Sequence, residues 1–331
     1  MKKTRRNFLL QAGQFTAGIG LLGFYSCDTV KETIDTGVTK TKDKMEDMTI
    51  KQFFKISLAQ WSLNKAFFGG ELDNLDFSAK TKNDFGIDAV EYSSQFFQDK
   101  ANDFAFLKQM KQRADDNGVK SLLIMIDNEG NLGALDEAER AKAVENHYKW
   151  VDAAKFLDCH SIRVNAFGVG TAKEVGTAAV DGLGKLSEYA AKDSLNIIVE
   201  NHGSYSSNGA WLADVMKNVG MDNCGTLPDF GNFCIKRDNG RRWGGNCIEE
   251  YDRYKGVIEM MPYAKAISAK SHDFDSEGNE THTDYVKMLQ IVKDAGYRGY
   301  IGIEYEGEVL DADAGIKATR DLLIKAGAMV S

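Results

Sequence analysis

The sequence lacks several features that would point to common functional classes. No Gly-x-Gly-x-x-Gly segment follows the first strand-like run, which argues against a dinucleotide cofactor. The five cysteines include no Cys-x-x-Cys pair, so a zinc ribbon and a dithiol redox motif are both excluded. Only two of the 331 residues are proline, and 43% are hydrophobic. This composition is typical of a globular chain rather than of a collagen-like or disordered one.

Acidic residues outnumber basic ones, 49 to 41. The formal net charge is −8 at pH 7. Residues 1–26 contribute four basic side chains and no acid, so the rest of the chain carries a net charge of −12. Such a surface repels polyanions and anionic lipid head groups. We therefore expect no nucleic-acid partner and no polybasic membrane contact, whereas small neutral substrates are unaffected.

The first 27 residues resemble a twin-arginine export signal. Arg5 and Arg6 precede an uncharged stretch that ends at Tyr25, and Cys27 stands where bacterial lipoprotein precursors carry the lipidated cysteine. We expect a signal over residues 1–27 with Cys27 lipidated, plain cleavage being the alternative. A polar tether over residues 28–52 and a folded domain over residues 53–331 would follow. The protein would then be periplasmic or in the cell envelope, touching the membrane only through its N-terminus.

Four further cysteines lie in the expected domain. The twin-arginine route carries proteins that have already folded in a reducing compartment. We therefore expect Cys159, Cys224, Cys234 and Cys247 to be buried free thiols, with a Cys234–Cys247 disulfide as the alternative.

Short apolar runs alternate with amphipathic helical patterns along the domain. The predicted strands are Phe54–Gln60, Ala89–Tyr92, Ser121–Ile126, Ser161–Val164, Asn196–Glu200, Cys224–Pro228, Ala264–Ala269 and Tyr300–Glu304. The predicted helices include Ala101–Asn117, Ala134–Leu157, Lys173–Asp193, Asp284–Ala295 and Ala312–Ala326.

Glycine marks three of the junctions between a predicted helix and the next strand. Gly86, Gly118 and Gly296 stand where a left-handed helix cap is needed, and glycine adopts that conformation without a Cβ clash. The repeat of strand, helix and strand predicts an α/β fold, a single (β/α)₈ TIM barrel. An open doubly wound sheet is the alternative.

Acidic residues follow three of the predicted strands. Glu200, Asp229 and Glu304 would converge on the barrel axis, because the C-terminal strand ends of a barrel meet at one face. Three close carboxylates repel one another unless a cation compensates them. The sequence thus predicts a divalent metal on these acids, with His272 as the fourth ligand. This donor set suits Mn²⁺, our first expectation, and also Co²⁺, Mg²⁺ or Zn²⁺.

On these residues the chain resembles the sugar isomerase/epimerase superfamily, whose fold is the xylose isomerase-like barrel. The resemblance covers about residues 53–327 and is carried by Val199-Glu200-Asn201-His202-Gly203, Asp229-Phe230-Gly231-Asn232 and Ile303-Glu304. The superfamily includes ketose 3-epimerases, hydroxypyruvate isomerases and inosose dehydratases. The resemblance implies that Glu200, Asp229 and Glu304 bind a metal and that the two glutamates also move protons.

The seventh predicted strand departs from that family's pattern. Many relatives have His-x-Lys-Asp there, with the histidine on the metal, and Ser268 takes that position in Ser268-Ala269-Lys270. His272 shares the facing of Ser268 if the strand continues, because side-chain direction repeats every two residues. Alternatively, Lys270 enters the site as an acid or oxyanion partner while water fills the coordination gap.

Two further polar residues are expected at the predicted barrel face. His202 either contacts substrate or acts as a base, or it supports a metal ligand from behind. Arg163 is expected to neutralise buried charge by pairing with Glu91 or with Glu200.

Together the residues predict proton transfer next to a carbonyl. A divalent ion would stabilise an enediolate while carboxylates remove and return the proton. We expect a metal-dependent sugar isomerase or epimerase with Glu200, Glu304, His202 and Lys270 as catalytic candidates. Export and the lack of a phosphate-binding glycine loop favour a non-phosphorylated sugar or keto-sugar. The alternatives are a metal-dependent lyase that acts on 3-keto-glycosides by β-elimination and a non-catalytic sugar-binding lipoprotein.

Overall fold

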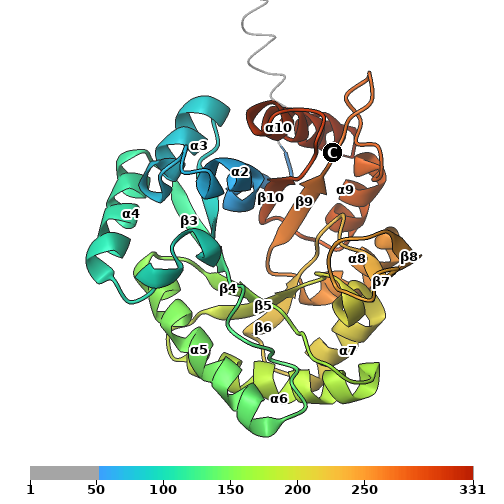
Figure 1. Ribbon diagram of the computed structural model, residues 1–331. Helices are drawn as coiled ribbons and strands as arrows, with labels where there is room; N and C mark the ends of the chain where they lie inside the picture. The colour runs from blue at the N-terminus through green and yellow to red at the C-terminus, as the bar shows by residue number, and fades with distance from the viewer. Residues whose placement is uncertain (1–51, 331) are drawn as a thin grey trace, which may run out of the picture. The chain divides into compact units, whose positions relative to one another are not determined.

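The computed structural model describes residues 52–330 (Figure 1). The expected export signal, Cys27 and all but the last residue of the expected tether lie outside the described residues. Within residues 52–330, no helix combines the length and the apolar composition needed to cross a bilayer.

Eight parallel strands form the centre of the domain, in the order β6-β5-β4-β3-β2-β1-β10-β9. The strands are β1 (Lys55–Ala59), β2 (Ala89–Ser93), β3 (Lys120–Met125), β4 (Ser161–Val164), β5 (Asn196–Glu200), β6 (Cys224–Leu227), β9 (Ile267–Ser271) and β10 (Tyr300–Tyr305). Parallel bridges Thr226–Ala264 and Asp229–Ser268 join the two ends of this order. The predicted α/β barrel is confirmed, and all eight predicted strands overlap the observed ones.

Helices surround the strands (Figure 1). They are α2 (Asn64–Phe68), α3 (Phe77–Phe85), α4 (Phe104–Asp116), α5 (Glu137–Phe156), α6 (Ala172–Ala191), α7 (Gly209–Val219), α8 (Arg253–Met260), α9 (Tyr285–Asp294) and α10 (Ala312–Met329). Polar caps fix several starts, as in α6, where Thr171 and Glu174 form a reciprocal capping box. Gly86, Gly118 and Gly296 have φ of 66°, 64° and 78°, so the predicted left-handed positions are confirmed.

The alternation of side chains along each strand separates two apolar layers. Ile197 and Val199 of β5 belong to the large core between the strands and the helices. Ile198 faces the interior instead, in a small cluster with Leu227 and Ala266. Ile198, Leu227 and Ala266 lie two positions before Glu200, Asp229 and Ser268. The same alternation therefore points those three polar side chains into the barrel interior, next to this apolar cluster.

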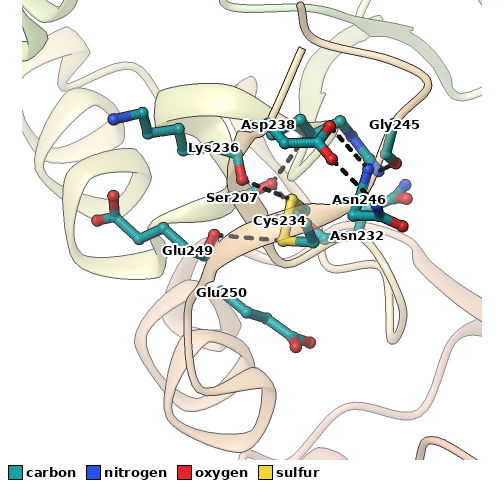
Figure 2. The surroundings of a disulfide bond; sticks show 12 residues. Ser207, Asn232, Cys234, Lys236, Asp238, Gly245, Asn246, Glu249 and Glu250 are labelled. Carbon is teal, nitrogen blue, oxygen red and sulfur yellow. Dashed lines mark hydrogen bonds between the residues drawn. A yellow bond between two sulfur atoms is a disulfide. The ribbon is translucent and has the colours of Figure 1, made fainter. Parts of the chain in front are cut away.

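An antiparallel hairpin follows β6 and was not predicted. Its strands are β7 (Cys234–Arg237) and β8 (Cys247–Glu250). A disulfide joins Cys234 to Cys247, with the Cα atoms 5.8 Å apart (Figure 2). The expectation of free thiols is wrong for this pair, because both residues lie on facing strands outside the core. It is confirmed for Cys159 and Cys224, which are buried and free.

Candidate active site

Three acids meet at the C-terminal ends of the strands, as predicted. Glu200 ends β5, Asp229 follows β6 by two residues, and Glu304 lies on β10. One carboxylate oxygen from each lies within 4.8 Å of those of the other two. All three side chains are buried. This set of oxygen donors could hold a divalent cation.

Burial raises the pKa of each of these acids. It raises the pKa of Asp229 to about 6 and that of Glu304 well above its usual range, and the nearby Glu200 adds to both shifts. Burial also raises the pKa of Glu200, against the opposing charge of Arg163. The barrel interior thus disfavours three bare negative charges, and positive charge has to accompany them.

Lys270 supplies one such charge from β9. Its Nζ lies 3.5 Å from Glu304 Oε2, 3.5 Å from Glu306 Oε2 and 3.9 Å from Asp229 Oδ2. Burial opposes its charge, but Glu304 and Glu306 raise the pKa of Lys270 well above its usual value, so the amine stays protonated. Its aliphatic stem packs on Gly231, where a Cβ would lie 2.9 Å from the stem.

Arg163 supplies the second positive charge. Its Nε lies 2.9 Å from Glu200 Oε2, and its Nη1 donates to Asp127 Oδ1 at 3.1 Å. Of the two partners expected for Arg163, Glu200 is therefore the one that pairs with it in the structure. Glu91 accepts instead from Ser57 Oγ at 2.6 Å, and burial raises its pKa to about 7.

Asp229 is held by a dense set of hydrogen bonds. Its Oδ1 accepts from the backbone N–H of Gly231 at 2.7 Å and of Asn232 at 2.8 Å. The Asn201 side chain accepts from the Asp229 N–H and donates to the Asp229 carbonyl. Asn232 Nδ2 in turn donates to Glu200 Oε1 at 2.9 Å. The residues of the two sequence motifs on β5 and β6 thus fix the orientation of both acids.

Ser268, rather than His272, contacts two of the three acids. The Ser268 hydroxyl lies 2.7 Å from Asp229 Oδ2 and 3.0 Å from Glu304 Oε2. β9 ends at Ser271, so the two-residue alternation does not carry on to His272. The His272 ring packs edge-on against the ring of His282, and the backbone N–H of His272 donates to Glu280 Oε1 at 3.3 Å. The structure therefore does not bring the expected imidazole ligand into the acid cluster.

His202 lies beside the acids with one ring nitrogen engaged. Its Nδ1 lies 2.9 Å from Asn165 Oδ1, and the Asn165 amide nitrogen donates to Asp127 at 2.8 Å. This network assigns the proton to Nδ1 and leaves Nε2 as an acceptor. Burial and the charge of Arg163 lower the pKa of His202 well below its usual value, so the ring is neutral.

A cavity of about 330 Å³ opens beside these groups, and of the three acids it is Glu304 that lines it. It is lined by Trp61, Ser93, Gln95, Met125, Asp127, Asn128, Arg163, His202, Asn232, Trp243, Lys270, Glu304 and Glu306. Two indole rings with several carboxylate, amide and amine groups are a suitable lining for a small polyhydroxylated ligand.

Residues 81–326 match the family described as the xylose isomerase-like TIM barrel. The chain belongs to this family. Its members share the barrel described above, and the polar strand ends of the present member lie at the face where such barrels carry their sites.

Solved structures of the same barrel are similar over most of this chain. The IOLI protein, solved with a bound zinc atom, has a TM-score of 0.62 at 15% identity, covering 84% of this chain and 99% of its own. D-psicose 3-epimerase, solved in the presence of D-fructose, has a TM-score of 0.58 at 16% identity, covering 83% and 98%. At these identities the similarity shows the fold.

A shorter similarity links the chain to the C-glycoside deglycosidase alpha subunit of Arthrobacter globiformis. The two sequences are 35% identical over 68 residues. The match spans 20% of this chain and 19% of that protein.

Several site residues of this family member were missed from sequence. Asp127 directly follows β3 and its apolar extension at Ile126, so its place at a strand end was a usable signal. Burial opposes its charge, but Arg163 holds the pKa of Asp127 below its usual range. Glu306 lies two residues after Glu304, where the alternation along β10 could have indicated it. Asn232 as a partner of Glu200 depends on a loop, and no sequence pattern gave it.

Proposed function

We propose that this protein is a divalent-metal-dependent sugar isomerase or epimerase that moves a proton next to a carbonyl. The observation that carries the proposal is the buried cluster of Glu200, Asp229 and Glu304, whose oxygens lie within 4.8 Å of one another. Small sugars as substrates are supported by the family and by the cavity beside the acids. The substrate we propose is a non-phosphorylated sugar or keto-sugar.

The residues present fit a divalent cation. Among residues 52–330, Lys270 and Arg163 are the basic side chains paired with the three buried carboxylates, so negative charge stays uncompensated once Asp127 and Glu306 are included. Glu200, Asp229 and Glu304 would hold the ion, with Mn²⁺ as the first candidate and Co²⁺, Mg²⁺ or Zn²⁺ as alternatives. When bound, such an ion polarises the carbonyl and stabilises negative charge on oxygen. His272 stays a hypothesis as a further ligand, and the geometry offers the Ser268 hydroxyl in its place.

The side chains provide proton carriers on two sides of the site. Glu200 on β5 and Glu304 on β10 flank Asp229, because β6 and β9 lie between their strands. In the proposed reaction one glutamate takes the proton from the carbon next to the carbonyl and the other returns it. His202 offers a neutral Nε2 as a hydrogen-bond acceptor or base. The Lys270 ammonium can donate a hydrogen bond or a proton to a substrate oxygen.

A lyase is the second candidate, favoured by the similarity to the C-glycoside deglycosidase subunit. In this reaction the base removes the proton from the carbon between the ketone and the glycosidic carbon of a 3-keto-glycoside. That electron pair forms a carbon–carbon double bond, and the bond to the leaving group breaks. The leaving group keeps the electrons of that bond and takes a proton, which the Lys270 ammonium, 3.5 Å from Glu304, can donate.

Export and anchoring are part of the proposal. Arg5, Arg6 and Cys27 support a cell-envelope location with a lipid anchor. Replacing both arginines by lysine should retain the precursor in the cytoplasm, and Cys27→Ala should release the protein from the membrane fraction. Fractionation that neither variant changes would exclude this location.

Deuterium exchange tests the reaction. The full-length protein with Mn²⁺ is mixed in D₂O with a panel of ketoses and 3-keto-glycosides, and exchange is followed by NMR. Exchange with return of an epimer or isomer supports the first candidate. Exchange with release of the leaving group supports the lyase. Binding without exchange of any substrate would indicate a non-catalytic sugar-binding lipoprotein and reject both enzymes.

A further inference from the structure

A second cavity adjoins the one beside the acids. Its volume is about 350 Å³, and it shares Asp127, Asn128, His202 and Trp243 with the first. Because four residues line both cavities, a ligand that reacts at the acids can extend past His202 into the second cavity. A single sugar ring over the acids would leave that second space unused.

The tip of the disulfide-closed hairpin forms one wall of the second cavity. Trp243 packs against His202 with the ring centroids 4.5 Å apart, and Arg242 lies 3.3 Å over the ring of Phe167. Gly203, at a φ of 88°, allows this approach, because a Cβ there would lie 3.1 Å from the Arg242 side chain. Trp243 remains 44% exposed, so much of its ring is free for a ligand.

The hairpin tip is braced by polar contacts that hold this wall in place. Asn239 Nδ2 donates to the carbonyls of Trp243 and Gly244, and Arg237 Nε donates to the carbonyl of Arg242. Asn246 donates from its backbone and its side chain to Asp238, beside the disulfide (Figure 2). Such a framework positions Arg242 and Trp243 before any ligand arrives.

Arg242 is the uncompensated charge of the second cavity. Among residues 52–330 it forms no ion pair, and its buried Nε has no hydrogen-bond partner. The acids of this cavity are already paired: Asp127 with Arg163 at 3.1 Å, and Glu129 with Lys149 at 2.7 Å. A buried donor without an acceptor is costly, and a ligand oxygen would remove that cost.

We propose that the second cavity binds the aglycone of a glycoside, specifically a planar group that carries an oxygen acceptor. Trp243 supplies the stacking surface and Arg242 the donor, and a carboxylate or phenolate oxygen is the group that a guanidinium binds most strongly. The inference rests on the proposed function, since it places the reacting sugar over the acids. It narrows the substrate from sugars in general to glycosides of planar, oxygen-bearing aglycones.

Binding of unreactive ligands tests the subsite apart from the chemistry. Methyl, phenyl and 4-carboxyphenyl β-glucosides, which lack the ketone, are titrated against the full-length protein by calorimetry. The phenyl glucoside should bind about tenfold more tightly than the methyl glucoside, and the 4-carboxyphenyl glucoside about tenfold more tightly again.

Variants then separate the two roles. Arg242→Gln should remove the advantage of the carboxylate and keep that of the phenyl ring, and Arg242→Lys should restore part of it. Trp243→Ala should weaken both aromatic glucosides. Ile248→Ala changes an exposed apolar residue on the same hairpin and serves as the control, with all three affinities expected to match those of the unsubstituted protein.

Two results would overturn the subsite. One is an equal effect of Arg242→Gln on all three glucosides. The other is tighter binding of cellobiose than of phenyl glucoside, which would assign the second cavity to a sugar. These results are distinct from a failure of the proposed function, which would appear as Arg242-dependent binding without deuterium exchange of any keto-glycoside.

Discussion

The acid cluster and the hairpin wall meet at the same cavity but are built in different ways. Glu200, Asp229 and Glu304 are buried and are positioned by parallel strands. Trp243 is half-exposed and stands on an antiparallel hairpin closed by the Cys234–Cys247 disulfide. The barrel thus fixes the groups suited to chemistry, and the hairpin after β6 adds a surface suited to ligand selection. Substitutions in the acid cluster should therefore alter proton exchange and metal affinity, whereas changes in the hairpin should alter ligand affinity.

The largest effect is expected from the proposed proton carriers. Glu200→Gln and Glu304→Gln each remove a charge and a base while keeping the shape of the side chain. Proton exchange should fall by about 10³–10⁴-fold in each variant, and saturating Mn²⁺ should not restore it. NMR exchange rates in D₂O measure this. Full turnover by either variant at saturating metal would show that another residue carries the proton, and His202 and Lys270 are the next candidates.

The stability of the barrel interior should depend on pH through Glu91. Its folded-state pKa is about 7, above the value of 4.5 for the free side chain. The folded state therefore binds an extra proton between these values, and this contribution to stability is lost as the pH rises through about 7. The glutamine of Glu91→Gln does not titrate. At pH 8 the free energy of unfolding of this variant should exceed that of the unsubstituted protein by up to about 3 kcal/mol.

Near pH 4.5, where Glu91 is protonated in the folded state, the variant and the unsubstituted protein should have similar stability. Urea unfolding at both pH values measures the difference. A variant that is less stable at pH 8 would mean that the charged form of Glu91 is stabilising, through the nearby charge of Arg163.

Asp229 should affect metal affinity more than chemistry. Asp229→Asn removes one formal charge from the ligand set and should weaken metal binding by about 10–100-fold. Excess metal should then recover part of the exchange activity, unlike in the two glutamine variants. Metal-dependent activity curves for the three variants make this comparison. A loss in Asp229→Asn that no metal concentration relieves would assign Asp229 to proton transfer.

The disulfide should have the smallest effect on the barrel. Reduction, or Cys234→Ser with Cys247→Ser, should weaken the binding of phenyl glucoside by a few fold, on the order of 1 kcal/mol, because the hairpin loses its closure. The barrel's own thiols, Cys159 and Cys224, are buried and serve as an internal control for labelling. Equal loss of deuterium exchange and of glucoside binding would mean that the hairpin supports the whole site.

The sequence predicted those site residues whose direction is set by the alternation of side chains along a strand. Each of Glu200, Asp229 and Glu304 follows an apolar run, so their facing could be inferred before their contacts were known. The position of His272 was harder to predict, because its expected direction required β9 to continue. The chain instead leaves the barrel after Ser271 and forms the Phe274–Glu280 bridge. The export route did not favour a disulfide, and the two short strands of the hairpin, of which β8 is fully exposed, carry no apolar alternation that would predict it.

Metal stoichiometry tests the central claim most directly. The metal-stripped full-length protein is titrated with Mn²⁺, and the free ion is followed by electron paramagnetic resonance. The account predicts one tightly bound Mn²⁺ per chain, lost in the Glu200→Gln, Asp229→Asn and Glu304→Gln triple variant while circular dichroism shows that the barrel remains folded. No binding by the unsubstituted protein, or equal binding by the triple variant, would contradict the assignment of these three acids to a metal.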